Sequence, residues 1–394
     1  MVKKWVKIPE VLFFQEGPGV RNTQYTNDGV KLLNVANLVD GKIDLSTSNR
    51  YISEEEAYGR YKHFLCDDGD FIIASSGIQV DYIDKKMGFV DISMLPLCMN
   101  TSTIRFKVLD PNKLKIKYFM YYLKSQHFKS QLVHFITGSA QLNYGPSHLK
   151  QMYMPIMNIN IQNEVISILD KVQTIIENAK KELTALDNLI KARFVEMFGD
   201  PSINPKKYTV QPLSTIAKYW NGLTYKPEDV SKEGIIVLRS SNIQNDQLDF
   251  SDTVRVNCRI AENKFVKDND ILMCSRNGSA KLVGKVALIK NLPKAMSFGA
   301  FMMIIRSVYY PYLMTYFQMP AFRAQIITGA TTTINQITGK MLDNVKLPIP
   351  DLSEIKEYLA FIQQVDKSKF VKINLVIYQN IIYYRISWFF DDKL

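Results

Sequence analysis

Residues 162–200 read QNEVISILDKVQTIIENAKKELTALDNLIKARFVEMFGD, and this stretch decides the fold. Its apolar residues recur in steps of three and four, the spacing that lines one face of an α-helix. These residues are Val165, Leu169, Val172, Ile176, Ala179, Leu183, Leu186, Ile190 and Phe194. Pro155 precedes the stretch and Gly199 ends it, so we predict one helix over 162–198, about 55 Å long. A helix of this length with one narrow apolar stripe needs a partner helix.

The chain repeats itself, and the repeat supplies this partner. The phrase ITGSAQLN at 136–143 returns as ITGATTTIN at 327–335, and each copy is followed by a Pro-containing stretch. Further on, IKARFVEMFGD (190–200) is echoed by IYYRISWFFDD (382–392). We therefore predict a second long helix over roughly 355–390. Its later part is rich in β-branched and aromatic residues, which alone would also allow a strand.

The segments upstream of the two helices also match at scattered points. Their shared residues are Asn37 and Asn242, Asp44 and Asp249, Asp70 and Asp270, and Ser75 and Ser275. Short β-like runs at 70–74, 271–274 and 301–306 lie between turn residues, and an aromatic-rich helical run follows in each half. The sequence thus predicts two similar α+β domains at 1–155 and 201–350. They are followed by long spacer helices at 156–200 and 351–394.

The composition favours a polyanionic partner. Lys and Arg outnumber Asp and Glu by 49 to 38, a formal net charge of +11. The four cysteines form no CxxC pair, so we expect neither a disulfide framework nor a zinc site, and we expect a cytoplasmic protein. No apolar run is long enough to span a membrane.

The catalytic motifs that we sought are incomplete. The stretch GSAKLVGKV at 278–286 has the wrong spacing for a P-loop and a valine where a hydroxyl should hold magnesium. Asp351, Glu354 and Lys356 could suggest a nuclease, but they open a predicted helix, where carboxylates favour the helix dipole. We therefore expect no catalytic residues, no metal and no cofactor.

This arrangement resembles the specificity (S) subunit of type I restriction–modification systems. The resemblance is carried by ITGSAQLNYGPSHLKQMYMPI at 136–156, by the helix at 168–200 and by ITGATTTINQITGKMLDNVKLPIPD at 327–351. It implies two target-recognition domains in a pseudo-twofold repeat, joined by two long helices that pack as an antiparallel coiled coil. It departs from the family at Ile355, where the first copy has the expected Gln162.

The same resemblance implies a function and partners. Each domain would read one half of a split site in double-stranded DNA, and the chain itself would be non-catalytic. Two methyltransferase (M) subunits would bind along the helices, and restriction (R) motor subunits would join this core. The helices would set the separation of the half-sites, as dimer geometry does in other DNA-binding proteins.

We expect DNA contacts from small polar loop residues, which can reach phosphates or base edges. The ITG loops supply Thr137, Gly138, Ser139, Gln141 and Asn143, and Thr328, Gly329, Thr331, Thr332 and Asn335. The turns after the β-like runs supply Ser75, Ser76, Gly77 and Gln79, and Ser275, Arg276, Asn277 and Lys281. A weaker candidate pair is Arg239 and Asn242. The alternative for every loop is a solvated structural turn.

Two other readings remain open at this stage. The chain could be a coiled-coil scaffold or interaction protein without a DNA role, in which case it would not bind DNA even with its partners present. It could also be an enzyme with an unrecognised site in one of the α+β domains, in which case the purified chain would show turnover.

Overall fold

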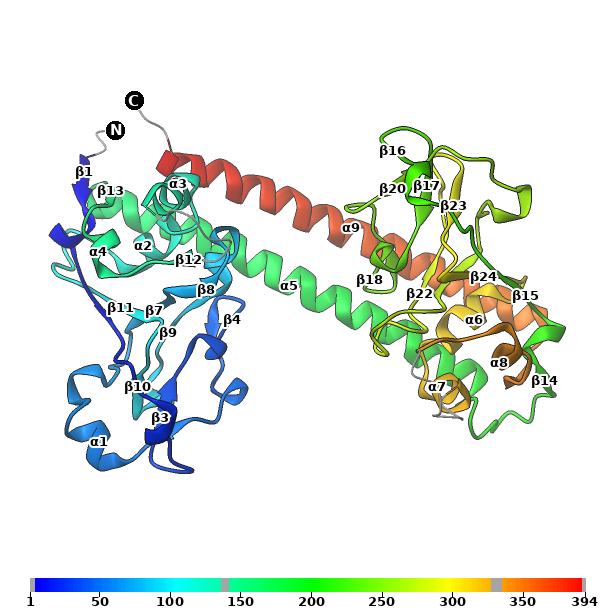
Figure 1. Cartoon of the computed structure of the whole chain (residues 1–394), viewed down its shortest axis with the longest axis horizontal. Helices are drawn as coiled ribbons and strands as arrows, with labels where there is room; N and C mark the ends of the chain where they lie inside the picture. Colours follow the sequence, from blue (N-terminus) through cyan, green and yellow to red (C-terminus); the bar gives the residue numbers. More distant parts are fainter. Residues whose placement is uncertain (1–3, 136–141, 327–334, 392–394) are drawn as a thin grey trace. The chain divides into compact units, whose positions relative to one another are not determined.

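The computed structural model describes residues 4–135, 142–326 and 335–391, and the chain divides into two compact units (Figure 1). Unit 1 is Met1–Lys180 with Asn374–Leu394, and unit 2 is Lys181–Ile373. Each long helix therefore contributes one part to each unit. The domain boundaries expected from the sequence treat the helices as separate segments, and they stay a prediction.

Unit 1 is built on an antiparallel four-stranded sheet and a smaller three-stranded sheet. The four-stranded sheet has the order β2 (Leu12–Glu16), β11 (Thr103–Val108), β7 (Phe71–Ala74) and β9 (Met87–Phe89). The three-stranded sheet has the order β10 (Leu97–Met99), β3 (Val30–Leu33) and β6 (Tyr51–Ile52), with β3 and β10 parallel.

Strand pairs and helices complete unit 1. The pairs are β1 (Lys4–Lys7) with β13 (Tyr153–Ile156), β4 (Leu38–Val39) with β5 (Lys42–Ile43), and β8 (Ser76–Ile78) with β12 (Leu142–Asn143). The helices are α1 (Glu54–Tyr58), α2 (Ile116–Tyr122), α3 (Gln126–Phe135), α4 (Pro146–Leu149) and the first part of α5 (Ile159–Phe198).

Unit 2 repeats this plan. Its main sheet has the order β15 (Lys218–Asn221), β24 (Met302–Arg306), β21 (Ile271–Cys274) and β22 (Val286–Leu288). Its second sheet has the order β16 (Val230–Ser231), β20 (Val254–Val256), β17 (Ile235–Leu238) and β23 (Met296–Phe298), with β17 and β23 parallel. The remaining pairs are β14 (Val210–Pro212) with β25 (Lys346–Pro348), and β18 (Ile243–Gln244) with β19 (Gln247–Leu248). The helices are α6 (Tyr310–Tyr316), α7 (Pro320–Ile326), α8 (Gly339–Asp343) and α9 (Leu352–Asp391).

The α+β repeat expected from the sequence is confirmed. The main sheets share one strand order, each second sheet contains one parallel pair, and α2, α3 and α4 correspond to α6, α7 and α8. Helix α1 of unit 1 and strand β16 of unit 2 are additions to this shared plan. Two details differ from the expectation. Each aromatic-rich run forms two short helices, and the run expected at 301–306 begins its strand at Met302. Phe301 lies in a turn that is closed by a hydrogen bond from the Met302 amide to the Gly299 carbonyl oxygen (2.8 Å).

Both long helices are present, including the second, which sequence propensity alone left open. Every residue of the predicted α5 stripe is buried or half-buried. The helix begins at Ile159, three residues earlier than expected, because the Asn158 side chain accepts a hydrogen bond from the Ile161 amide (3.0 Å). Gln162 is fully buried instead and bonds the backbone of Lys113 and Lys115 ahead of α2.

Within unit 2, α5 and α9 run antiparallel. Arg193 pairs with Glu357 (2.8 Å), Asp187 with Lys369, and Glu182 with Lys372. In these three pairs the residue number decreases along α5 as it increases along α9, which shows that the two helices run in opposite directions. Tyr358 adds a hydrogen bond from its hydroxyl to the Ile190 carbonyl oxygen (3.2 Å). Among the described residues, neither these helices nor any other is apolar enough over a sufficient length to cross a membrane.

The C-terminal end of each long helix closes the core of one unit. In unit 2, Phe198 at the end of α5 packs on Tyr312 and Tyr358, with ring centroids 5.2 and 5.3 Å away. In unit 1, Phe390 near the end of α9 packs on Tyr118 and Tyr122 at 5.2 and 5.9 Å. Each unit is therefore completed by a helix that starts in the other unit.

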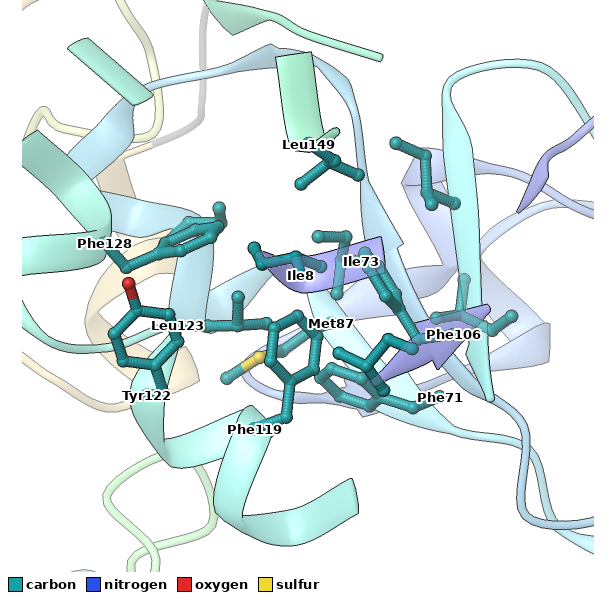
Figure 2. Packing of buried hydrophobic residues seen from close by; sticks show 14 of the residues in the cluster. Ile8, Phe71, Ile73, Met87, Phe106, Phe119, Tyr122, Leu123, Phe128 and Leu149 are labelled. Atoms are coloured by element: carbon teal, nitrogen blue, oxygen red, sulfur yellow. The ribbon is translucent and has the colours of Figure 1, made fainter. Parts of the chain in front are cut away.

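A cluster of aromatic side chains lies within the core of unit 1. Phe119 of α2 points at Phe71 and Phe106 of the main sheet (Figure 2), at centroid distances of 6.3 and 4.9 Å. All three are fully buried. The aromatic-rich run is thus core-facing, since it covers one face of the sheet.

A buried carboxylate anchors the start of the central strand in each unit. Asp70 and Asp270 each accept a hydrogen bond from a backbone amide three residues earlier (2.8 Å). In unit 2, Arg306 binds Asp270 through two atoms (2.6 and 2.7 Å). In unit 1, Lys107 stands at the matching register position and lies 3.3 Å from Asp70.

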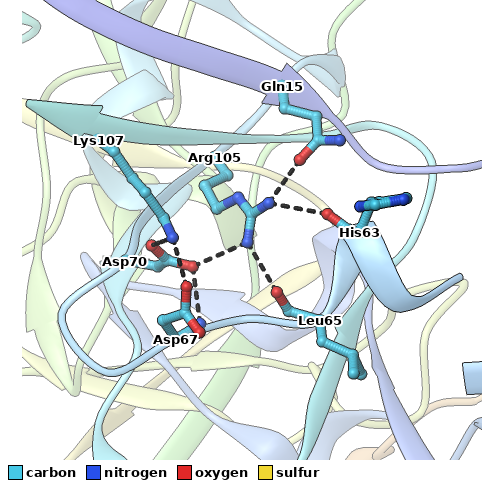
Figure 3. Close-up of polar contacts among 7 residues, drawn as sticks. All are labelled: Gln15, His63, Leu65, Asp67, Asp70, Arg105 and Lys107. Carbon is cyan, nitrogen blue, oxygen red and sulfur yellow. Dashed lines mark hydrogen bonds and ion pairs between the residues drawn. The ribbon is translucent and has the colours of Figure 1, made fainter. Parts of the chain in front are cut away.

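Unit 1 adds Arg105 to this anchor. Figure 3 shows Arg105 between Asp70 (3.2 Å), Gln15 and the carbonyl oxygens of Leu65 (2.7 Å) and His63 (2.9 Å). Its side chain is 7 % exposed. Unit 2 has Ile304 at the same register position, so this part of the network is specific to unit 1.

We predict that Arg105→Ile lowers the free energy of unfolding by about 3–5 kcal/mol, because it leaves a buried carboxylate poorly compensated. Lys107→Met is the matched control, since the Lys107 side chain is 38 % exposed, and it should cost less than about 1 kcal/mol. Thermal unfolding of the full chain, followed by circular dichroism, measures both. An equal decrease in the free energy of unfolding for the two variants would contradict the conclusion that Arg105 is the main partner of the buried Asp70 carboxylate.

Candidate nucleic-acid interface

The two loop surfaces predicted from the sequence meet in unit 1. Strand β8 begins directly after Ser75, and strand β12 is formed by the last two residues of the first ITG phrase. The two strands pair antiparallel, with Ser76 opposite Asn143. The Tyr144 amide donates to the Ser75 carbonyl oxygen (2.9 Å). The turn after the central strand and the end of the ITG phrase therefore form one surface.

The same loops meet in unit 2. Arg276 bridges to Gln336, and the Ile337 amide donates to the Ser275 carbonyl oxygen (2.7 Å). The Asn277 amide donates to the Asn335 carbonyl oxygen (3.3 Å). The Asn277 side chain also donates to the Ser240 hydroxyl (3.2 Å), which brings the third candidate segment to the same place.

Three of the predicted contact residues are buried and hold the turns together. The Ser75 hydroxyl donates to Glu16 (3.1 Å), and the Ser275 hydroxyl donates to the Phe301 carbonyl oxygen (2.9 Å). Asn242 is 0 % exposed; its side chain accepts from the Arg239 amide and donates to two backbone carbonyl oxygens (all 2.8 Å). Asn37 makes the corresponding bonds in unit 1, so this asparagine is part of the repeated fold.

The other described candidates reach the surface to different degrees. The exposed ones are Gly77, Gln79, Asn143, Arg276, Lys281 and Asn335, and the half-buried ones are Ser76, Arg239 and Asn277. Arg239 pairs with Asp252 (2.8 Å). The Asn277 side chain also accepts a hydrogen bond from the Ser279 amide (2.9 Å), so much of its capacity is used within the loop.

Eight candidates lie outside the described residues, and their contacts with DNA stay a prediction. They are Thr137, Gly138, Ser139, Gln141, Thr328, Gly329, Thr331 and Thr332.

Phe301 belongs to this surface and was missed by sequence reasoning. Its carbonyl oxygen accepts hydrogen bonds from the Ser275 and Arg276 amides (3.0 and 3.1 Å) and from the Ser275 hydroxyl. Its ring lies under the Arg276 guanidinium, 5.3 Å from the centroid. The signal in the sequence was Gly299-Ala300 just before it, which marks a turn where a strand was expected.

Hydrogen bonds and burial shift the pKa values of three titratable groups near these loops. The Ser251 hydroxyl and amide hold the pKa of Asp249 below its usual range, and Ser46 does the same for Asp44 in unit 1. Burial raises the pKa of the Cys274 thiol next to Ser275. In the described part of the chain, no group of three or more His, Cys, Asp or Glu side chains is arranged to hold a metal ion.

Comparison with protein families gives a match in each half of the chain. The model of the type I restriction modification DNA specificity domain matches residues 20–188 and again 205–377. The specificity subunit of the type I restriction enzyme EcoKI from Escherichia coli is 30 % identical over 178 residues, 42 % of this chain and 38 % of that protein. The specificity subunit of the type I restriction enzyme MjaVIII from Methanocaldococcus jannaschii is 23 % identical over 186 residues, 47 % and 43 % of the two chains. The chain thus matches less than half the length of either relative.

Solved structures show the same fold over the whole chain. The S subunit of a type I restriction–modification system from M. genitalium aligns over 100 % of this chain and 97 % of its own, with a TM-score of 0.54 and 15 % identity. A chain from a structure concerned with assembly and conformational transition of the type I R-M system aligns over 98 % and 96 %, with a TM-score of 0.56 and 17 % identity.

We predict that Asn242→Ala destabilises the chain by about 1–3 kcal/mol, because it leaves buried backbone groups without partners. Arg276→Ala should change stability by less than about 0.5 kcal/mol, since Arg276 is exposed. Urea denaturation of both variants and of Asn37→Ala, the unit 1 counterpart of Asn242→Ala, measures this difference. Wild-type stability of Asn242→Ala would show that this amide does not hold the turn.

Proposed function

The chain belongs to the type I restriction modification DNA specificity family, and we propose that it is the DNA-recognition subunit of a type I restriction–modification complex. Each unit reads one half of a bipartite double-stranded DNA target. The single observation that carries this proposal is the family match in both halves of a chain whose two main sheets share one strand order. The chain acts by binding and is not itself catalytic. A subunit that works on cellular DNA is expected in the cytoplasm.

The chemistry of the loop surfaces suits this role. A net charge of +11 attracts a polyanion, and the exposed amides, hydroxyls and cations at the loops can bond phosphates and base edges. In unit 1 the contacts come from Ser76, Gly77, Gln79 and Asn143, and in unit 2 from Arg276, Asn277, Lys281 and Asn335. Further contacts come from the ITG residues at 137–141 and 328–332, which precede Asn143 and Asn335 by a few positions in the chain.

The buried candidates do not contact DNA themselves but position the residues that do. Ser75, Ser275 and Asn242 fix the turns that present the exposed residues. Arg239, which is paired with Asp252, supports the same loop.

The long helices offer docking positions for methyltransferase subunits, with restriction subunits joining the assembled core. Several apolar side chains are exposed on the long-helix segments of each unit. Neighbouring exposed apolar side chains are typical of surfaces that bind another protein. In unit 2 the exposed side chains include Phe370 and Val371 of α9, and in unit 1 Ile168 and Ile175 of α5. One set in each unit suits two methyltransferase subunits per chain.

The sharpest test of the proposed function is to map modified bases in genomic DNA of the source cell with this gene intact and deleted. We expect deletion to abolish modification at one motif that consists of two short half-sites around a fixed gap. Replacing residues 201–350 by the matching segment of another family member should change one half-site and leave the other as it was.

Three outcomes would contradict this proposal in whole or in part. Unchanged modification, together with no binding of genomic DNA by the chain and its co-purified partners, would favour the scaffold without a DNA role. Turnover of a substrate by the purified chain would favour an enzyme. A change in both half-sites after the segment replacement would contradict the assignment of one half-site to each unit.

We predict that Phe370→Ser with Val371→Ser removes one of the two methyltransferase subunits, and that Ile168→Ser with Ile175→Ser removes the other. The reason is the loss of apolar surface that docking would bury. Native mass spectrometry of the co-expressed complex measures the stoichiometry. The control is Ile203→Ser with Val308→Ser, two exposed apolar residues outside the long helices, which should leave both subunits bound. Retention of both subunits in all three variants would contradict docking at these positions.

A further inference from the structure

The side chain of Phe301 is 59 % exposed at the tip of the turn between β23 and β24. A single exposed apolar residue is common on protein surfaces and by itself indicates nothing. Phe301 differs because its position is fixed. Its carbonyl oxygen accepts three hydrogen bonds from Ser275 and Arg276, so the turn is tied to the loop of the proposed DNA surface.

The neighbouring strand end also fixes this turn. The Gly222 amide donates to the Met302 carbonyl oxygen (3.1 Å). A Cβ atom at Gly222 would lie only 2.1 Å from the Phe298 carbonyl oxygen and 2.3 Å from that of Gly299. The backbone that carries Phe301 is therefore packed against β15 at a distance that only glycine permits.

Arg276 and Phe301 form one exposed pair. The guanidinium carbon lies 5.3 Å from the ring centroid, which restrains the arginine side chain while the Phe301 residue stays more than half exposed. No hydrogen bond of the described residues uses the Arg276 side chain, so its donors are available to a ligand. Base pairs in DNA are stacked about 3.4 Å apart, so two neighbouring side chains of this kind can address adjacent bases.

Unit 1 lacks this pair at the corresponding position. The Ser102 carbonyl oxygen accepts from the Ser75 amide (2.8 Å), as that of Phe301 accepts from the Ser275 amide. Unit 1 thus has Ser102 for Phe301 and Ser76 for Arg276. The backbones differ as well: the Ser102 carbonyl oxygen accepts one of the three bonds that the Phe301 carbonyl oxygen accepts, and Ser102 has a left-handed φ of 66°.

We propose that Phe301 determines specificity by contacting the 5-methyl group of a thymine, beside a guanine that Arg276 reads, in the half-site of unit 2. An arginine recognises guanine through O6 and N7 in the major groove, and phenylalanine recognises thymine through its methyl group there. This assignment rests on the proposed function and deepens it. The half-site read by unit 1 has no such contact at the matching position.

The mapped target is the first test. The half-site that changes when residues 201–350 are replaced must contain a guanine next to a thymine on one strand. A unit 2 half-site without this step would overturn the assignment while leaving the proposed function intact.

The second test uses duplexes in which each thymine of that half-site is replaced by uracil, which removes only the methyl group. Binding by the complex of the chain with its methyltransferase subunits is measured at fixed salt. We expect one replacement to weaken binding about fourfold, the value of one buried methyl-sized group. In Phe301→Ser, which copies unit 1, binding to the thymine duplex should fall by a similar factor, and the thymine–uracil difference should disappear.

Controls separate this assignment from misfolding and from the proposed function. Val308→Ser, which changes another exposed apolar residue beyond the other end of β24, should keep the thymine–uracil difference. Arg276→Ala should abolish sensitivity to 7-deazaguanine at the adjacent position. A wild-type complex that tolerates every uracil, or a Phe301→Ser complex that still prefers thymine, would overturn the assignment. A wild-type complex that does not prefer the mapped motif to a scrambled duplex would overturn the proposed function itself.

Discussion

Completion of each core by the far end of a long helix is the constraint on which the rest of the structure depends. Phe390 and Phe198 fill equivalent places, each against a tyrosine of the short helix that covers the main sheet. Both are almost fully buried, so removing either would open a cavity in a core built from aromatic side chains. The helices therefore have two roles: they are part of each core, and they are the spacer between the repeated segments. A change in their register would disturb both roles at once.

The two long helices and the repeated α+β domains could be predicted from the sequence. The sequence did not reveal that the C-terminal end of each long helix completes the core of a unit. The stripe from Val165 to Phe194 specified one helix, because a period of three and four over that length has no other regular solution. The second helix was visible only through the repeat, since its later residues also suit a strand. Periodicity shows which face of a helix is apolar but does not name what covers it. The exchange of helix ends between units was therefore beyond sequence reasoning.

The candidate interface was predictable in part, and the errors follow a pattern. Residues shared by both halves, such as Asn242, Asp270 and Ser275, are buried and hold turns, because the common fold needs them. Residues that differ at matching positions, such as Ser102 and Phe301, lie where the units present different surfaces. Polar character alone suggested exposure for Asn242 and Ser275, whereas the apolar Phe301 was missed. The pairing of β8 with β12 joins segments far apart in the chain, which local patterns cannot reveal.

The exchanged helix ends also impose an order on biosynthesis. Tyr118 leaves the ribosome long before Phe390, so the first unit begins to fold without the side chain that closes its core. The second unit receives Phe198 before most of its own strands have been made. The N-terminal unit is therefore synthesised first and finished last. Until translation has passed Phe390, the apolar side chains around Tyr118 are exposed surface that favours aggregation of the nascent chain.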